Sequence, residues 1–166
     1  MSDLASQIRE IWRVLDGLIS QERFHSDKFM ITVEGGMAVK LTNNTGAATV
    51  KGNVVTNSAT TANAVVLAVD GEPDALGVFY ESGIANGAAA WVVVSGIADV
   101  YFAASTTLGH LARTFISGEA GYVIGQAKSE AIPTSPFATD KHFCEIGHVL
   151  EARVGAGLAK CVLHFN

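Results

Sequence analysis

The sequence predicts a mainly β protein, a small β-barrel body preceded by one amphipathic α-helix. Short runs of apolar and β-branched residues alternate with turn residues along most of the chain. The chain contains 17 Gly but only 3 Pro, a composition that suits many tight turns between strands. The N-terminal block departs most from this pattern, because its apolar residues recur at helical spacing. With 49% hydrophobic and 16% charged residues, the chain can fill a core.

The N-terminal block, residues 2–24, is expected to form the helix, with Ser2 or Asp3 capping its first turn. Its apolar residues follow a heptad-like spacing, and two further residues widen the same face. This seam is the predicted protein interface, and it consists of Leu4, Ile8, Ile11, Trp12, Leu15, Leu18 and Ile19. An isolated helix of this length is marginal in water, and Gly17 weakens it further. The seam must therefore pack either on its own domain or on another chain, and both alternatives stay open.

We divide the chain into a helical arm at residues 1–28 and a β-rich barrel domain at residues 29–166. The turn between the arm and the first strand gives the boundary. The candidate strands of the barrel domain are residues 29–34, 38–42, 48–51, 64–69, 76–81, 90–95, 98–103, 121–128, 142–153 and 158–165. Residues 53–63 and 131–140 are expected to form loops. Residues 108–116 show helical spacing and are expected to form a short helix.

No grouping of reactive side chains predicts catalysis, a metal site or a cofactor, so we expect a protein that is not an enzyme. On one strand, His142 and His148 lie six residues apart, roughly 20 Å, which is too far for one metal ion. His142 and Cys144 alone would supply too few ligands. The sequence also lacks a nucleophile elbow and a phosphate loop. Glu145 and Glu151 are expected on a solvated outer sheet face, although their use as a catalytic pair stays an alternative.

Cys144 and Cys161 are expected to be free, buried thiols. If residues 154–157 form the turn of a hairpin, Cys161 lies near Leu150. Cys144 then lies roughly 20 Å further along the strand, whereas a disulfide needs Cα atoms within about 7 Å. On the same period-two reasoning, Val92 and Val94 are expected to share one core with Cys161 and Leu163.

Charge and hydropathy exclude two classes of partner. The net charge is −5 with a pI of about 5.4, and the basic residues are scattered, so nucleic acid is not expected to bind. The apolar runs are too short to cross a bilayer, so no membrane association is expected. A secretory signal is not visible either, which predicts synthesis in the cytoplasm.

Three segments carry a resemblance to a known family: KGNVV at residues 51–55, DALGVFYE at 74–81 and WVVVSGIADV at 91–100. Their succession resembles the head decoration, or capsid cement, proteins of tailed bacteriophages, whose small barrel is of the β-tulip type. Residues 142–151 and 160–166 are similar too, so the resemblance covers roughly residues 50–166. The N-terminal helix departs from the family, whose small members begin with a flexible arm.

The resemblance implies a structural virion protein on the capsid exterior, made in the host cytoplasm. It further implies a homotrimer that clamps neighbouring subunits of the major capsid protein and needs no cofactor. Two alternatives remain open. One is another virion part, such as a tail or baseplate barrel or an adhesin, and the other is a small-ligand-binding or enzymatic β-barrel.

Overall fold

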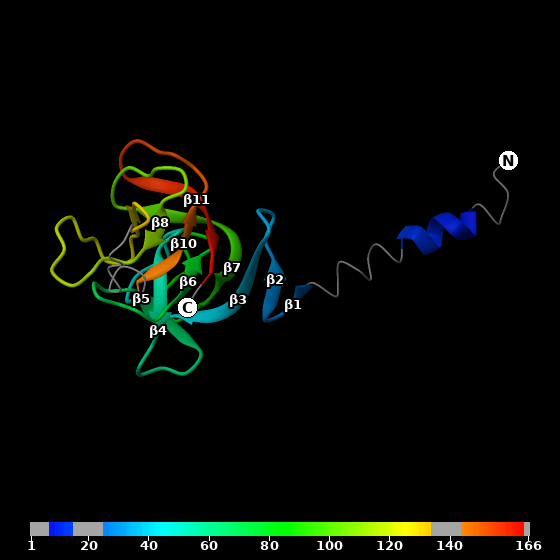
Figure 1. Cartoon of the computed structure of the whole chain (residues 1–166). Helices are drawn as coiled ribbons and strands as arrows, with labels where there is room; N and C mark the ends of the chain where they lie inside the picture. The colour runs from blue at the N-terminus through cyan, green and yellow to red at the C-terminus, as the bar shows by residue number, and fades with distance from the viewer. Residues whose placement is uncertain (1–6, 15–24, 134–143, 165–166) are drawn as a thin grey trace.

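The computed structural model describes residues 7–14, 25–133 and 144–164, and within them the fold is mainly β with one short helix at residues 7–14 (Figure 1). The mainly β fold class expected from the sequence is confirmed. None of the described helical residues form a segment long and apolar enough to cross a membrane. The strands are β1 (His25–Ser26), β2 (Phe29–Ile31), β3 (Gly36–Asn43), β4 (Val54–Asn57), β5 (Ala64–Leu67), β6 (Ala75–Phe79), β7 (Ala89–Phe102), β8 (Leu111–Arg113), β9 (Lys128–Glu130), β10 (Glu145–Val149) and β11 (Gly157–Leu163).

Five of the strands close into a ring, in the order β3-β5-β4-β6-β7 and back to β3. Every neighbouring pair in the ring is antiparallel except β3 and β5, which run parallel. Side chains from all five strands meet in one apolar cluster, which consists of Val55, Val65, Phe79, Ala90 and Val92, with Leu41 packed against them. This cluster fills the ring.

The long strand β7 connects the ring to the second half of the sheet. Its first half pairs with β3 and β6, and its second half pairs with β11 from Gly96 to Phe102. The sheet continues through β10, β8 and β9. Just before β9, Ala127 forms a parallel bridge with Phe102 and thereby returns to β7. A second, larger apolar cluster draws residues from both halves and joins them.

The body begins with a small hairpin. β1 pairs with β2, and β2 pairs with β3, so these strands extend the sheet on the N-terminal side of the ring (Figure 1). The hairpin spans residue 28, where the sequence placed the boundary between the arm and the barrel domain.

Several expected elements differ in the structure. Residues 90–95 and 98–103 belong to one continuous strand, β7. Gly96, between the two runs, pairs with Gly36 of β3 on one side and with Leu163 of β11 on the other, so the strand is not interrupted. The expected loop at residues 53–63 contains β4, which the abundance of small polar residues concealed. Residues 48–51 and 121–127 form no strand, and only Lys128 of the last run belongs to one. Of the strand expected at residues 142–153, the structure describes residues 144–153. Within them the strand is shorter than expected, because β10 covers only Glu145–Val149.

The short helix expected at residues 108–116 is wrong. β8 lies there, between β9 and β10, and Leu111, Ala112 and Arg113 are all buried. A strand that is buried on both faces does not alternate between apolar and polar residues. Its apolar residues can therefore imitate helical spacing over a short window.

The single core expected around Val92, Val94, Cys161 and Leu163 is also wrong. Val92 belongs to the cluster inside the ring, and Val94 packs against that cluster. Cys161 and Leu163 belong to the larger cluster, to which β7 contributes Val93. Neighbouring residues of β7 point to opposite faces, and both faces are covered by apolar side chains.

The cysteine prediction is confirmed for the described thiols. β10 and β11 form the expected antiparallel hairpin, in which Val149 faces Cys161. Cys144 and Cys161 are both buried and free. Burial raises the pKa of the Cys161 thiol to about 12, so this thiol is protonated and unreactive at neutral pH.

Replacing Leu163 with alanine tests the larger core. Leu163 is fully buried at the end of β11, so we expect the free energy of unfolding to fall by about 2–5 kcal/mol. The matched control is Leu150→Ala, whose side chain is half-exposed and is expected to cost about 0.5 kcal/mol or less. Urea denaturation followed by circular dichroism measures both. Equal midpoints for the two variants would contradict the burial of Leu163.

Candidate functional site

The helix seam predicted as an interface is exposed where the structure describes it. Ile8, Ile11 and Trp12 are 46%, 58% and 60% exposed. On another face of the helix, the Arg13 guanidinium pairs with Glu10 at 2.7 Å between Nη2 and Oε1. The remaining seam residues, Leu4, Leu15, Leu18 and Ile19, lie outside the described residues. The described part of the seam therefore presents three large apolar side chains to solvent.

A second candidate site gathers a carboxylate and two imidazoles at the end of the hairpin of β10 and β11. Glu145 Oε1 lies 3.4 Å from His148 Nε2 and 3.3 Å from His164 Nε2. The two imidazole ring centroids are 5.0 Å apart. One ligand atom from each of the three residues lies within 4.8 Å of the others. The Glu145 side chain is only 6% exposed, whereas those of His148 and His164 are 39% and 45% exposed.

The strand register explains this grouping. Gly147 pairs with Leu163 across the hairpin, and the backbone N–H of His164 donates to the Ile146 carbonyl at 3.1 Å. His164 therefore lies beside β10, opposite Ile146, and so between Glu145 and His148 along the strand. A register shift between Glu145 and Gly147 against β8 breaks the simple alternation of faces. For this reason Glu145 is buried, and its expected place on a solvated outer face is wrong.

Reasoning from the sequence missed His164 because it compared histidines on one strand only. His142 lies outside the described residues, and Cys144 is buried. The signal was nevertheless available in the hairpin. Counting outward from the turn at residues 154–157 places His164 opposite residues 146–147, next to the chain positions of Glu145 and His148.

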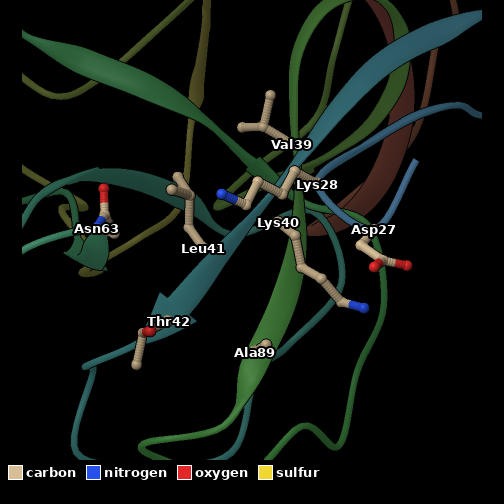
Figure 2. Close-up of a pocket in the computed structure, with 8 residues that line it drawn as sticks. All are labelled: Asp27, Lys28, Val39, Lys40, Leu41, Thr42, Asn63 and Ala89. Carbon is tan, nitrogen blue, oxygen red and sulfur yellow. The ribbon is translucent and has the colours of Figure 1, made fainter. Parts of the chain in front are cut away.

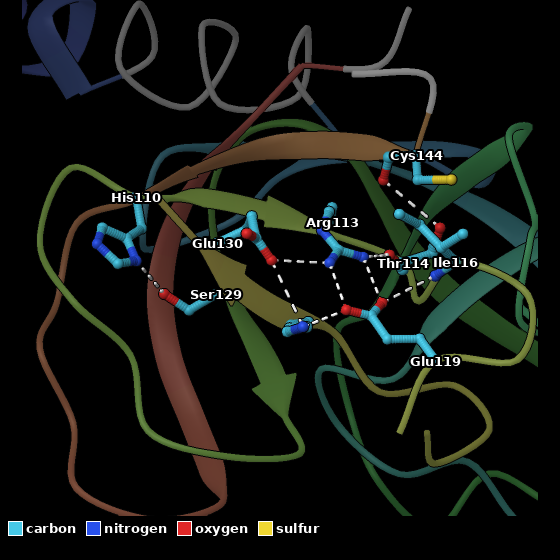
Figure 3. Close-up of polar contacts among 9 residues, drawn as sticks. His110, Arg113, Thr114, Ile116, Glu119, Ser129, Glu130 and Cys144 are labelled. Carbon is cyan, nitrogen blue, oxygen red and sulfur yellow. Dashed lines mark hydrogen bonds and ion pairs between the residues drawn. The ribbon is translucent and has the colours of Figure 1, made fainter. Parts of the chain in front are cut away.

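A partly buried ion network, centred on Arg113, holds the loop between β8 and β9. The Arg113 side chain is fully buried, and its guanidinium donates to Glu119 Oε2 and Oε1 at 2.8 and 2.7 Å (Figure 3). The same guanidinium reaches Glu130 Oε2 at 2.8 Å and the Thr114 carbonyl at 2.9 Å. Lys128 pairs with both carboxylates. Two cations and two anions therefore balance one another beneath the loop.

The network changes the acidity of Glu119. Hydrogen bonds from the Arg113 guanidinium, followed by those from Lys128 and the Ile116 N–H, lower the pKa of Glu119 from 4.5 to about 2. This carboxylate is therefore ionised throughout the neutral and mildly acidic range. A permanently ionised group held on both oxygens suits a structural role better than proton transfer.

An open groove of about 530 Å³ lies beside β3 (Figure 2). β7 occupies one edge of β3, and β2 and β5 pair with successive parts of the other edge. The groove marks the junction of β2 and β5. Its lining consists of Asp27, Lys28, Val39, Lys40, Leu41, Thr42, Asn63 and Ala89. Lysines and aliphatic side chains dominate this lining, which places no imidazole or thiol in the groove.

Comparison with known proteins gives weak similarity to solved structures and no match elsewhere. No protein-family model matches the chain, and no curated protein matches it either. Among solved structures, the chain is similar to a crystal structure of the head fiber gp8.5 N base of bacteriophage phi29. The identity is 11% and the TM-score is 0.49, over 76% of this chain and 92% of that chain. At this TM-score the similarity assigns no function.

Proposed function

We propose that this chain is a structural protein of a tailed-phage virion that decorates the capsid exterior and stabilises the shell. The observation that supports the proposal is where the segments of the family resemblance lie in the fold. Residues 51–55 lead into β4, residues 74–81 contain β6, and residues 91–100 lie within β7. These strands are consecutive neighbours in the sheet, in the order β4-β6-β7. The resemblance therefore describes one contiguous piece of the barrel rather than scattered strand patterns.

In this proposal the N-terminal helix attaches the β-rich barrel domain to its partners. The seam exposes Ile8, Ile11 and Trp12, and apolar surface of this kind on a helix is stabilised by burial against another protein. Ile8 and Ile11 occupy the a and d positions of the heptad pattern. Isoleucine at both positions favours assemblies of three or more helices, which is why we propose a homotrimer.

The proposed action on the capsid is mechanical and needs no catalysis, cofactor, nucleic acid or membrane. A protein that binds the assembled shell and not its separate subunits stabilises the shell by mass action. Three equivalent contacts from one trimer to neighbouring major capsid subunits would raise the effective affinity through multivalency. The net charge of −5 is consistent with a role away from the packaged nucleic acid.

The test is a charge-neutral pair of substitutions in the seam, Ile8→Glu with Ile11→Lys. We expect this variant to lose trimerisation, or to lose binding to heads of the phage that encodes it, while the circular dichroism of the β body stays unchanged. Burying an unpaired charge in an apolar interface costs several kcal/mol, so the loss of binding should be complete at working concentrations. Sedimentation with purified heads and light scattering measure the two properties.

The matched control reverses an exposed ion pair of the same helix, Glu10→Arg with Arg13→Glu. It also leaves the net charge unchanged, and it keeps the pair at helical spacing three residues apart. We expect normal decoration by this control. Full occupancy of heads by the seam variant would contradict the proposed attachment. Recovery of the wild-type chain from tails rather than heads of purified virions would contradict capsid decoration and favour the tail alternative.

A further inference from the structure

We propose that Glu145, His148 and His164 form a binding site for a divalent transition-metal ion, with Zn²⁺ as the preferred ion. The site is independent of the proposed role in the virion. Two imidazole nitrogens and one carboxylate oxygen form a ligand set that suits Zn²⁺ and its neighbours in the first transition row, whereas Mg²⁺ and Ca²⁺ prefer oxygen ligands only.

The distances carry the proposal. A tetrahedral Zn²⁺ holds imidazole nitrogen and carboxylate oxygen at about 2.0–2.2 Å, so two such ligand atoms lie about 3.3–3.5 Å apart. Glu145 Oε1 lies 3.4 Å from His148 Nε2 and 3.3 Å from His164 Nε2. Both separations have this length, and both involve the same carboxylate oxygen. All three ligand atoms lie within 4.8 Å of one another, so they are gathered closely enough to hold one ion.

An ion pair between Glu145 and protonated imidazoles explains these distances less well. A charge-assisted hydrogen bond between nitrogen and a carboxylate oxygen is typically about 2.7–2.9 Å long. The two observed distances exceed this range by roughly half an ångström. Arg113 faces Glu145 in the neighbouring strand β8, but the hydrogen bonds of its guanidinium go to Glu119, Glu130 and Thr114. Both imidazoles therefore lie at the distance from the Glu145 carboxylate that a shared metal ion would impose.

Exposure and position indicate what the ion would do. The Glu145 side chain is buried, while the two imidazoles are partly exposed, so the ion can enter from solvent and keep a water molecule as its fourth ligand. Glu145 and His148 belong to β10, and His164 follows directly after β11. The ion would therefore clamp the end of β11 to β10 and stabilise the folded chain, because binding requires both strands in register.

The test measures Zn²⁺ binding to the full chain without a polyhistidine tag, after treatment with a chelator. Isothermal titration with Zn²⁺ alone is expected to show one site per chain, and Zn²⁺ but not Mg²⁺ should raise the melting temperature. His164→Gln should weaken Zn²⁺ binding by about 100-fold or more, beyond the 10- to 100-fold loss that follows removal of a group that only supports a ligand. Co²⁺ bound in place of Zn²⁺ should show the intense visible absorption of a four-coordinate ion.

His110→Gln is the matched control, since His110 lies outside the cluster and contacts Ser129. We expect this variant to bind Zn²⁺ as the wild type does. Glu145→Gln removes the charged ligand at nearly constant volume and should also abolish the Zn²⁺-dependent rise in melting temperature. If Glu145→Gln fails to fold, the half-exposed His164 still provides the test. Equal Zn²⁺ affinity of His164→Gln and the wild type, or no binding by the wild type, would overturn the proposal.

Discussion

Replacing Arg113 with methionine is expected to lower the free energy of unfolding by about 3–5 kcal/mol, because it removes the fully buried member of a partly buried ion network. The Arg113 side chain is fully buried and provides the hydrogen bonds that hold Glu119 and Glu130 together. Methionine fills similar volume but removes the guanidinium that both carboxylates share. Urea denaturation followed by circular dichroism measures the change.

The control for this variant is Lys160→Met. Lys160 pairs with Asp99 at 3.1 Å between Nζ and Oδ1, but its side chain is 47% exposed. An exposed ion pair contributes about 0–1 kcal/mol, so the same loss of a positive charge should have little effect here. Similar costs for Lys160→Met and Arg113→Met would contradict the structural role of the network.

The pH dependence of stability gives a second readout on the same network. Because the folded protein lowers the pKa of Glu119 from 4.5 to about 2, the ionised carboxylate contributes stability above about pH 4.5. This contribution is lost as the pH falls from 4.5 through about 2, where the folded protein takes up the proton. In Arg113→Met we expect this part of the acid dependence to be much smaller. An unchanged acid profile would show that Arg113 is not the cause of the lowered pKa.

Replacing Gly147 with alanine is expected to destabilise the chain by at least about 3 kcal/mol and to disturb the hairpin of β10 and β11. Gly147 has φ of +154°, a conformation that residues with a side chain rarely adopt. A Cβ atom at Gly147 would lie 2.1 Å from the Val162 carbonyl oxygen and 3.0 Å from the Leu163 Cα. The φ value alone costs roughly 1–3 kcal/mol, and the backbone of β11 must also move.

Gly155→Ala is the matched control, because Gly155 also has a positive φ, +76°, but a Cβ there would meet no atom within 4 Å. The expected cost is therefore only the conformational one, about 1–2 kcal/mol. The difference between the two variants in urea denaturation isolates the clash with β11. If both variants lose the same stability, the close approach of β11 to Gly147 is not a constraint on the fold.

Gly147 also separates Glu145 from His148 in the candidate metal site. The register shift against β8 lies between Glu145 and Gly147, and it turns the Glu145 carboxylate inward toward the two imidazoles. A side chain at Gly147 would displace the very strand that is followed by His164. We therefore expect Gly147→Ala to weaken Zn²⁺ binding as well as folding, whereas Gly155→Ala should leave binding unchanged.

Some features of this protein were determined by local sequence patterns alone. Glycine-rich turns between β-branched runs predicted the mainly β class. The hairpin around residues 154–157 was also predicted: Cys161 was expected near Leu150, and its observed partner is the adjacent residue, Val149. The helix at residues 7–14 lies within the predicted amphipathic block. These features depend on residues that are close in the chain, where turn chemistry and side-chain period act directly.

Tertiary structure alone decided the rest. Residues 111–113 became a strand because β9 and β10 pair with both edges, a long-range effect that overrides local helical spacing. Glu119 and Glu130, distant from one another in sequence, meet at Arg113 only after the loop has folded back. The grouping of His164 with Glu145 and His148 required a register shift and a neighbouring strand. The spacing of residues along one strand predicts neither the register shift nor the neighbouring strand. Pairing between strands decides which residues share a site, and the register of that pairing depends on the whole sheet.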